Sequence, residues 1–239
     1  MTLGPILITA PSGVTVDADQ LIVGDGANTH VIIANFDNAA NNLFTLAGNA
    51  AINSSRAPSF ATNALQLDGT NDTATYSNFP GAVPANTAVC IEAFVYSDLA
   101  LASPTTTRNI VTWGPSGTTG WRFCYDQTLF SMVLLDGNSN VISSGAGNVP
   151  AQSTWTHVAV CRNAAGTWGI FVGGTRYATV SDATALGSST GDLIVGEGYA
   201  GDDWDGAISR VVITIGFTPY DPTKSTLRVP KRLARLSLR

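Results

Sequence analysis

The sequence has few charged side chains, and those it has are unevenly distributed. Only 12% of the 239 residues are charged, well under the ~25% typical of globular proteins. Residues 1–223 contain all 17 acidic residues and six arginines, a formal charge of −11. Residues 224–239 contain six basic residues and no acidic one, a charge of +6. We therefore expect an acidic body with an uncharged polar surface and a basic tail.

Residues that carry most enzymatic chemistry are also scarce. His30 and His157 are the only histidines, and Glu92 and Glu197 are the only glutamates. The sequence has no G-x-S-x-G nucleophile elbow, no Cys/His pair, no zinc-type spacing and no phosphate-binding loop. His157 follows Trp155 in the strand-like run WTHVAV, where we expect a packed, hydrogen-bonded histidine. The sequence therefore predicts a protein that is not an enzyme and needs no cofactor.

Cysteines are few and odd in number. Cys90, Cys124 and Cys161 are far apart, and each lies inside a strand-like run. Their spacing fits no metal motif, and small thiol side chains suit a hydrophobic core. We expect three buried free thiols.

Membrane and export signals are absent as well. No apolar run approaches the ~18 residues of a membrane span. The sequence opens with MTLGPILITAPSG, which has no basic region of the kind that begins a secretory signal. We expect no membrane partner, and a protein that either stays inside the cell or leaves it by assembly or lysis.

Alternating hydrophobic runs, by contrast, occur throughout the chain. The run AVCIEAFVY at 88–96 has apolar residues on both faces, which is typical of a strand in the middle of a packed sandwich. One face would hold Val89, Ile91, Ala93 and Val95, and the other Cys90, Glu92, Phe94 and Tyr96. Similar runs lie at 31–36, 64–68, 121–126, 130–136, 155–162, 168–174, 192–198 and 207–216.

Turn signals separate these runs, and no helix signal does. Asp-Gly and Asn-rich clusters at 25–28, 68–72, 136–140 and 163–166 supply the backbone conformations that tight hairpins need. No amphipathic segment of 12 or more residues is present. The pattern predicts an all-β antiparallel sandwich or barrel without an internal linker.

Four segments resemble one family in the right order: LQLDGTNDTATYS (65–77), AVCIEAFVYS (88–97), WTHVAVCRNAAGTWGIFVGGTRYATV (155–180) and LIVGEGYAGDDWDGAISRVVIT (193–214). Together they resemble laminin-G-like, concanavalin A-like domains, in particular those of bacteriophage virion proteins. The resemblance implies a two-sheet jelly roll over 30–218, with extended arms at 1–29 and 219–239. The acidic pair of the family's closing strand is replaced here by Ser209 and Arg210.

The family includes lectins, glycan hydrolases and pure interaction modules, so the fold alone does not decide the function. Its hydrolases place catalytic carboxylates at alternate positions of one strand, on either side of the glycosidic bond. Asp203 and Asp205 have that spacing but adjoin a glycine at a loop–strand boundary. We therefore expect a non-enzymatic structural virion protein on the particle exterior, a capsid decoration or a fibre or tail module. The alternative is a carbohydrate-binding adhesin, and a glycan hydrolase is the least favoured hypothesis.

One loop contains the residue types of a ligand site. Tyr199, Asp202, Asp203 and Trp204 combine aromatic rings with carboxylates, as sugar sites do, although Trp204 matches an aromatic that the family packs against its sheet. Asp202, Asp203 and Asp205 are alternatively candidates for calcium, which prefers oxygen ligands. A solvated acidic loop is the third interpretation, and it is the default.

The basic tail is the second candidate site. It interleaves leucines with cations and predicts a docking arm for other virion subunits, including copies of the same chain. Nucleic acid is the competing partner for a basic tail, but the acidic body and the lack of stacking aromatics disfavour it. The predicted docking cations are Lys224, Arg228, Lys231, Arg232, Arg235 and Arg239.

Overall fold

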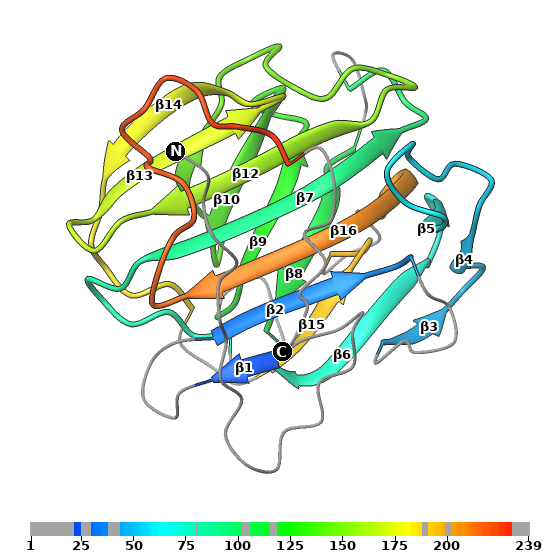
Figure 1. Cartoon of the computed structure of the whole chain (residues 1–239), viewed down its shortest axis with the longest axis horizontal. Coiled ribbons are helices and arrows are strands. Elements are labelled where there is room, and N and C mark those ends of the chain that lie inside the picture. Colours follow the sequence, from blue (N-terminus) through cyan, green and yellow to red (C-terminus); the bar gives the residue numbers. More distant parts are fainter. Residues whose placement is uncertain are drawn as a thin grey trace.

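The computed structural model describes residues 22–24, 30–37, 44–79, 81–101, 106–114, 119–187, 191–198 and 202–230. These residues form β-strands, turns and loops and contain no helix, so none of them makes a helix able to cross a membrane. The strands build two antiparallel sheets packed face to face (Figure 1). The predicted all-β sandwich is confirmed.

The larger sheet has nine strands. Seven of them run side by side in the order β1-β2-β16-β7-β12-β13-β14, while β5 pairs with β16 and β4 with β5. Their bounds are β1 (Ile22–Gly24), β2 (His30–Asn35), β4 (Ala51–Asn53), β5 (Ala64–Asp68), β7 (Val89–Ser97), β12 (Thr156–Arg162), β13 (Thr167–Val172), β14 (Thr175–Ser181) and β16 (Asp205–Ile215).

The smaller sheet has seven strands in the order β11-β10-β9-β8-β15-β6-β3. Each neighbouring pair is antiparallel. Their bounds are β3 (Thr45–Ala47), β6 (Thr73–Phe79), β8 (Arg108–Trp113), β9 (Trp121–Asp126), β10 (Ser131–Asp136), β11 (Ser139–Ser143) and β15 (Gly191–Val195).

The main core lies between the two sheets, and β7 shows how the sequence pattern builds it. Its residues Val89, Ile91, Ala93 and Val95 all point into this core, where each fully buried Val or Ile stabilises the fold by about 1.5–3 kcal/mol. Cys90, on the opposite face of β7, packs in a second apolar cluster on the outside of the larger sheet. Both faces of β7 are therefore covered, as the sequence predicts.

The second cluster corrects the expectation for the cysteines. Cys161 in β12 lies directly opposite Cys90 in β7, with their Cα atoms 4.1 Å apart, and a disulfide joins them. Only Cys124 is a free thiol, and it is buried. The prediction of three free thiols is wrong for two of them because sequence spacing does not reveal which strands become neighbours.

A C-terminal strap, residues 217–230, covers the second cluster. It leaves β16 and crosses the outer face of the larger sheet over β12, β13 and β14 (the orange-to-red trace in Figure 1). Tyr220 and Leu227 pack on the cluster around Cys90. Backbone hydrogen bonds from Arg176 N–H to Ser225 O (2.9 Å) and from Leu227 N–H to Gly174 O (2.9 Å) fix the strap to β14 and the turn before it. Part of the predicted arm at 219–239 is thus docked on the chain's own sheet.

The sandwich has two distinct ends, and β16 reaches from one to the other. Asp205 begins β16 and pairs with Asp68, next to the 68–72 turn; we call this the acidic end. Ile215 ends β16 opposite Val89, which in turn pairs with Arg162; we call this the pocket end. Eleven extended residues separate the two ends, a distance of about 36 Å at ~3.3 Å per residue.

Candidate functional site

Asp203, a predicted ligand residue, ties the acidic end together. It is 2% exposed. Its Oδ2 accepts the backbone N–H of Asn71 (2.6 Å), and its carbonyl oxygen accepts Arg108 Nη1 (2.6 Å). Two loops more than 130 residues apart in sequence and strand β8 are held together through this one residue. Its contacts are those of a structural cross-link.

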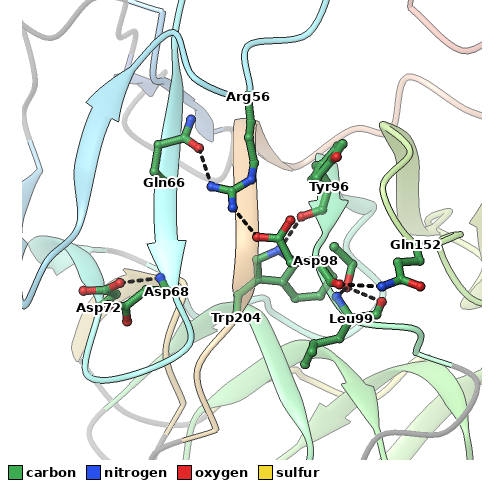
Figure 2. A network of polar contacts seen from close by, with 10 residues as sticks. Arg56, Gln66, Asp68, Asp72, Tyr96, Asp98, Leu99, Gln152 and Trp204 are labelled. Carbon is green, nitrogen blue, oxygen red and sulfur yellow. Dashed lines mark hydrogen bonds and ion pairs between the residues drawn. The ribbon is translucent and has the colours of Figure 1, made fainter.

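Trp204, the predicted stacking residue, lies inside the sandwich. Its ring is 1% exposed, and its indole N–H donates to Tyr96 O (3.0 Å), as Figure 2 shows. Its backbone N–H donates to Gly196 O (2.7 Å). A ring so enclosed presents no face to a sugar, so the stacking role does not fit this placement. The packing of the matching aromatic against the family's sheet does fit it.

Asp202 lies over the outer face of the smaller sheet. Its carbonyl oxygen accepts both the backbone N–H (2.9 Å) and the Nδ2 (3.0 Å) of Asn109, and its carboxylate is 3.6 Å from Arg122 Nη1. Burial raises the pKa of Asp202, and the charge of Arg122 partly opposes this rise. Tyr199, the fourth predicted ligand residue, lies outside the described residues.

The calcium hypothesis gains no ligand set from this geometry. Asp203 is directed at Asn71 and Asp202 at Arg122, while burial and then the charge of Asp98 raise the pKa of Asp205. Nowhere in the described part of the chain do three or more His, Cys, Asp or Glu side chains come close enough to share a metal ion.

The turn at 68–72 contacts the acidic loop, and the sequence did not predict this contact. Asp72 is buried, and its carboxylate accepts the backbone N–H groups of Asn49 and Asp68. Burial raises the pKa of Asp72 in spite of these donors. The Asp-Gly signal predicts the turn, but its docking against Asp203 depends on the tertiary fold.

Arg56 extends the same polar network along the edge of the larger sheet. Its guanidinium bridges Asp98 (2.5 Å) and Gln66 (3.3 Å), and its carbonyl oxygen accepts the indole N–H of Trp155 (3.0 Å). Figure 2 shows the side chain of Arg56 between those of Asp98 and Gln66, above Trp204. The network joins the segment before β5 to the end of β7, and its contacts are structural.

A buried polar triad lies beneath the C-terminal strap. Glu92 Oε2 contacts His157 Nε2 at 2.7 Å and accepts the hydroxyl of Tyr220 at 2.6 Å. Burial alone would raise the pKa of Glu92, but His157 and Tyr220 outweigh it and lower that pKa. The prediction of a packed, hydrogen-bonded His157 is confirmed. The triad's partner in the strap, Tyr220, carried no signal in the sequence.

The pocket end contains an open cavity of about 170 Å³. It lies between the β10–β11 hairpin of the smaller sheet and the end of the larger sheet. The sequence analysis missed it, since the Asp-Gly cluster at 136–140 indicated only a turn. Its lining consists of Asp136, Ser139, Asn140, Val141, Arg162, Trp168, Asp182, Thr184, Ala185 and Leu186.

Arg162 holds the cavity wall in place. Its guanidinium lies over the ring of Trp168, 5.0 Å from the ring centroid. Its three nitrogens donate to the carbonyl oxygens of Pro84, Thr87 and Thr184. Burial lowers the pKa of Arg162, but a guanidinium stays charged in proteins.

The predicted docking cations are only partly described. The ammonium of Lys224 is largely exposed and lies 3.9 Å from the carboxylate of Asp221. Arg228 belongs to the strap. Lys231, Arg232, Arg235 and Arg239 lie outside the described residues, as does most of the predicted N-terminal arm.

Solved structures with a similar fold are distant in sequence. Domain 4 of AbnA, an extracellular arabinanase from Geobacillus stearothermophilus solved with arabinotriose, matches with a TM-score of 0.58 and 15% identity, over 78% of this chain and 93% of that domain. The binding domain of Paraclostridial Mosquitocidal Protein 1 matches with a TM-score of 0.53 and 10% identity, over 86% and 50%. The binding domain of botulinum neurotoxin serotype G matches with a TM-score of 0.52 and 12% identity, over 74% and 44%.

Sequence comparison gives the family. No curated protein sequence matches the chain. A family model does match residues 68–214, from the turn at the acidic end to the last residues of β16. That range contains β6 to β15 whole, most of β16 and most of the cavity-lining and acidic-end residues described above. The chain belongs to the concanavalin A-like lectin/glucanase superfamily.

Proposed function

We propose that the chain is a non-enzymatic structural protein of a bacteriophage virion. It would decorate the particle exterior or form part of a fibre or tail, and bind other virion subunits, including copies of itself, through its termini. The motifs shared with phage virion modules support this role, as does the opposite charge of the body and the tail.

The observation that carries the proposal is the C-terminal strap. Backbone hydrogen bonds at Ser225 and Leu227 fix it to the sheet, so the basic sequence that follows Pro230 starts from a defined point on the module. A tethered basic segment suits an acidic surface on a neighbouring copy, because the attraction acts near the surface and weakens with salt.

Deleting residues 231–239 tests this role. The truncated chain keeps the strap and should melt at the same temperature as the full chain, yet enter particles poorly. A chain whose last nine residues are replaced by an uncharged Gly/Ser segment is the matched control, and it should fail in the same way. Normal incorporation of both variants would refute docking through the tail.

The proposal that the module lacks enzymatic activity has its own test. At the acidic end, the Asp203 carboxylate accepts the backbone N–H of Asn71, and its carbonyl oxygen accepts Arg108. These contacts hold a side chain that is 2% exposed within the fold. Incubation with a panel of polysaccharides should release no reducing ends. Turnover that Asp203→Asn and Asp205→Asn abolish would overturn the proposal.

Carbohydrate recognition is the second candidate, and the cavity at the pocket end favours it. The cavity presents carboxylate, amide and hydroxyl groups, the kind of polar groups that fix the orientation of a ligand in a small-molecule site. A sandwich of the same fold has been solved with arabinotriose. Screening the whole chain on a glycan array tests this function, and binding to no glycan would reject it.

A further inference from the structure

We infer that the cavity at the pocket end binds one neutral sugar ring, a terminal hexose or pentose of a glycan. The inference rests on the proposed carbohydrate recognition and names its site and ligand class. It moves the site from the acidic loop, which the sequence singles out, to the opposite end of the sandwich. The cavity's size, rigidity and hydrogen-bonding groups each support this.

The size of the cavity suits a single ring. Its volume of about 170 Å³ leaves room for one sugar ring and no room for an oligosaccharide. The cavity is partly open to solvent, so the rest of a glycan chain can extend out of it. A terminal residue is therefore the part that would enter.

The walls are held in place before any ligand arrives. The loop after β14 forms one wall and is tied at four points. Trp168 Nε1 donates to Asp182 O (2.9 Å), Arg162 Nη1 to Thr184 O, and Gly187 N–H to Asp136 Oδ1 (3.0 Å). A pair of backbone hydrogen bonds, both 2.9 Å, joins Leu186 to Val83. Binding to such a rigid wall costs little ordering entropy, which favours affinity for a small ligand.

The hydrogen-bonding groups of the cavity are mainly acceptors. Asp136 uses Oδ1 for Gly187, and Asp182 uses Oδ1 for the backbone and hydroxyl of Thr184. The Oδ2 atoms of both carboxylates accept no hydrogen bond from the described residues. Burial, and to a smaller extent the charge of Asp182, raises the pKa of Asp136. Both side chains line the cavity, and their two Oδ2 atoms match the hydroxyl donors of a sugar.

The same charges select against acidic sugars. Arg162 is the one cation among the lining residues, and its nitrogens already donate to three carbonyl oxygens. Three of the five guanidinium N–H groups are therefore used, and Arg162 is only 1% exposed, so it is poorly placed to meet a ligand carboxylate. Asp136 and Asp182 would repel one. Sialic and uronic acids should be excluded, and neutral hexoses or pentoses accepted.

Recognition here does not require ring stacking. Trp168 belongs to the lining but is 1% exposed, and Arg162 already covers its ring. Asn140 and Ser139, both exposed on the β10–β11 hairpin, supply the amide and hydroxyl groups at the mouth. Hydrogen bonds to the ring hydroxyls are therefore expected to dominate.

Glycan-array binding by pocket variants of the full chain tests the inference. Asp136→Asn and Asn140→Ala are combined in one variant, and the rival variant at the acidic loop is Asp202→Asn. The Asn at 136 keeps the oxygen that accepts Gly187, so the fold is retained, and thermal melting checks this. The pocket variant should lose about ten-fold or more in affinity, the scale of a lost hydrogen bond to a charged group. Asp202→Asn should bind like the wild type.

The outcomes separate the inference from the function on which it rests. If the wild type binds no glycan, carbohydrate recognition itself fails. If the wild type binds but the folded pocket variant binds equally well, or binding is lost in Asp202→Asn, the site is wrong. Preference for sialylated or uronic glycans would overturn the ligand class. Binding that EDTA abolishes and calcium restores would overturn direct recognition by the carboxylates.

Discussion

Trp204 occupies the junction between the acidic loop and β16. It is among the largest fully buried side chains of the described residues, and its indole N–H is hydrogen-bonded to the carbonyl oxygen of Tyr96. A buried tryptophan in this position stabilises the fold through the volume it fills as well as through that hydrogen bond. Its neighbour Asp203 stabilises the fold through the hydrogen bonds that its oxygens accept.

Replacing Trp204 by alanine should therefore destabilise the fold by about 3–5 kcal/mol, the usual cost of emptying a buried aromatic site. Trp204→Phe should cost less, because it retains most of the volume and loses the hydrogen bond. Urea unfolding of the two variants and the wild type measures both effects. A Trp204→Ala variant as stable as the wild type would place the ring outside the core.

The residues at the acidic end show what sequence reasoning can and cannot find. Matching Trp204 to a packed aromatic and β16 to the closing strand requires only local pattern, and both are confirmed. The hydrogen bond from Asn71 to Asp203 spans 132 residues, and no local pattern encodes it. Long-range contacts of this kind decide whether the carboxylates of an acidic cluster are free to meet a ligand or are hydrogen-bonded within the fold.

At the scale of elements, the strap and β7 meet at Glu92. The pKa of Glu92 is lower in the folded than in the unfolded chain, so its ionised form stabilises the fold. That contribution is complete above the ordinary glutamate pKa of about 4.3 and is lost as the pH falls through the lower folded-state value. The strap, held by Tyr220, should loosen over the same range.

Glu92→Gln should consequently lower the free energy of unfolding by about 1–3 kcal/mol at neutral pH. The difference in free energy of unfolding between the variant and the wild type should shrink toward pH 3. Denaturant unfolding at several pH values measures it. Glu197→Gln is the matched control. Burial, and then the charge of Asp203, raises the pKa of Glu197, so its ionised form destabilises the fold and its replacement should not lower the free energy of unfolding at neutral pH. A gap that stays constant with pH would contradict the role of Glu92.

At the scale of the whole molecule, counting reactive thiols tests the disulfide between β7 and β12. Unfolded in the presence of a thiol reagent without reductant, the chain should label at one cysteine; after reduction it should label at three. Folded chain should not label, because Cys124 is buried and burial raises its pKa to about 12. Cys124→Ser should label at none without reduction, and three labelled sites before reduction would disprove the pairing.

The fold as a whole was accessible from the sequence because alternation and turn residues are local properties that most of the sixteen described strands share. Pairing across sheets was not. The cavity needs Asp136 from β10, Arg162 from β12 and Asp182 from the loop after β14, and only the packed sandwich brings these three together. The sequence predicted an arm that docks on other subunits, yet Leu227 of the strap packs on the apolar cluster around Cys90 of its own chain.

The position of the strap also bears on association between chains. β14 is the last strand of the larger sheet, and an edge strand with unpaired backbone groups is a template for another chain. Ser225 and Leu227 occupy those groups at Arg176 and Gly174, and Thr226 bridges Thr175. A proteolytic cut before Pro222 would therefore free the first residues of β14 to pair with a foreign strand. A cut after Pro230 would leave that edge sealed.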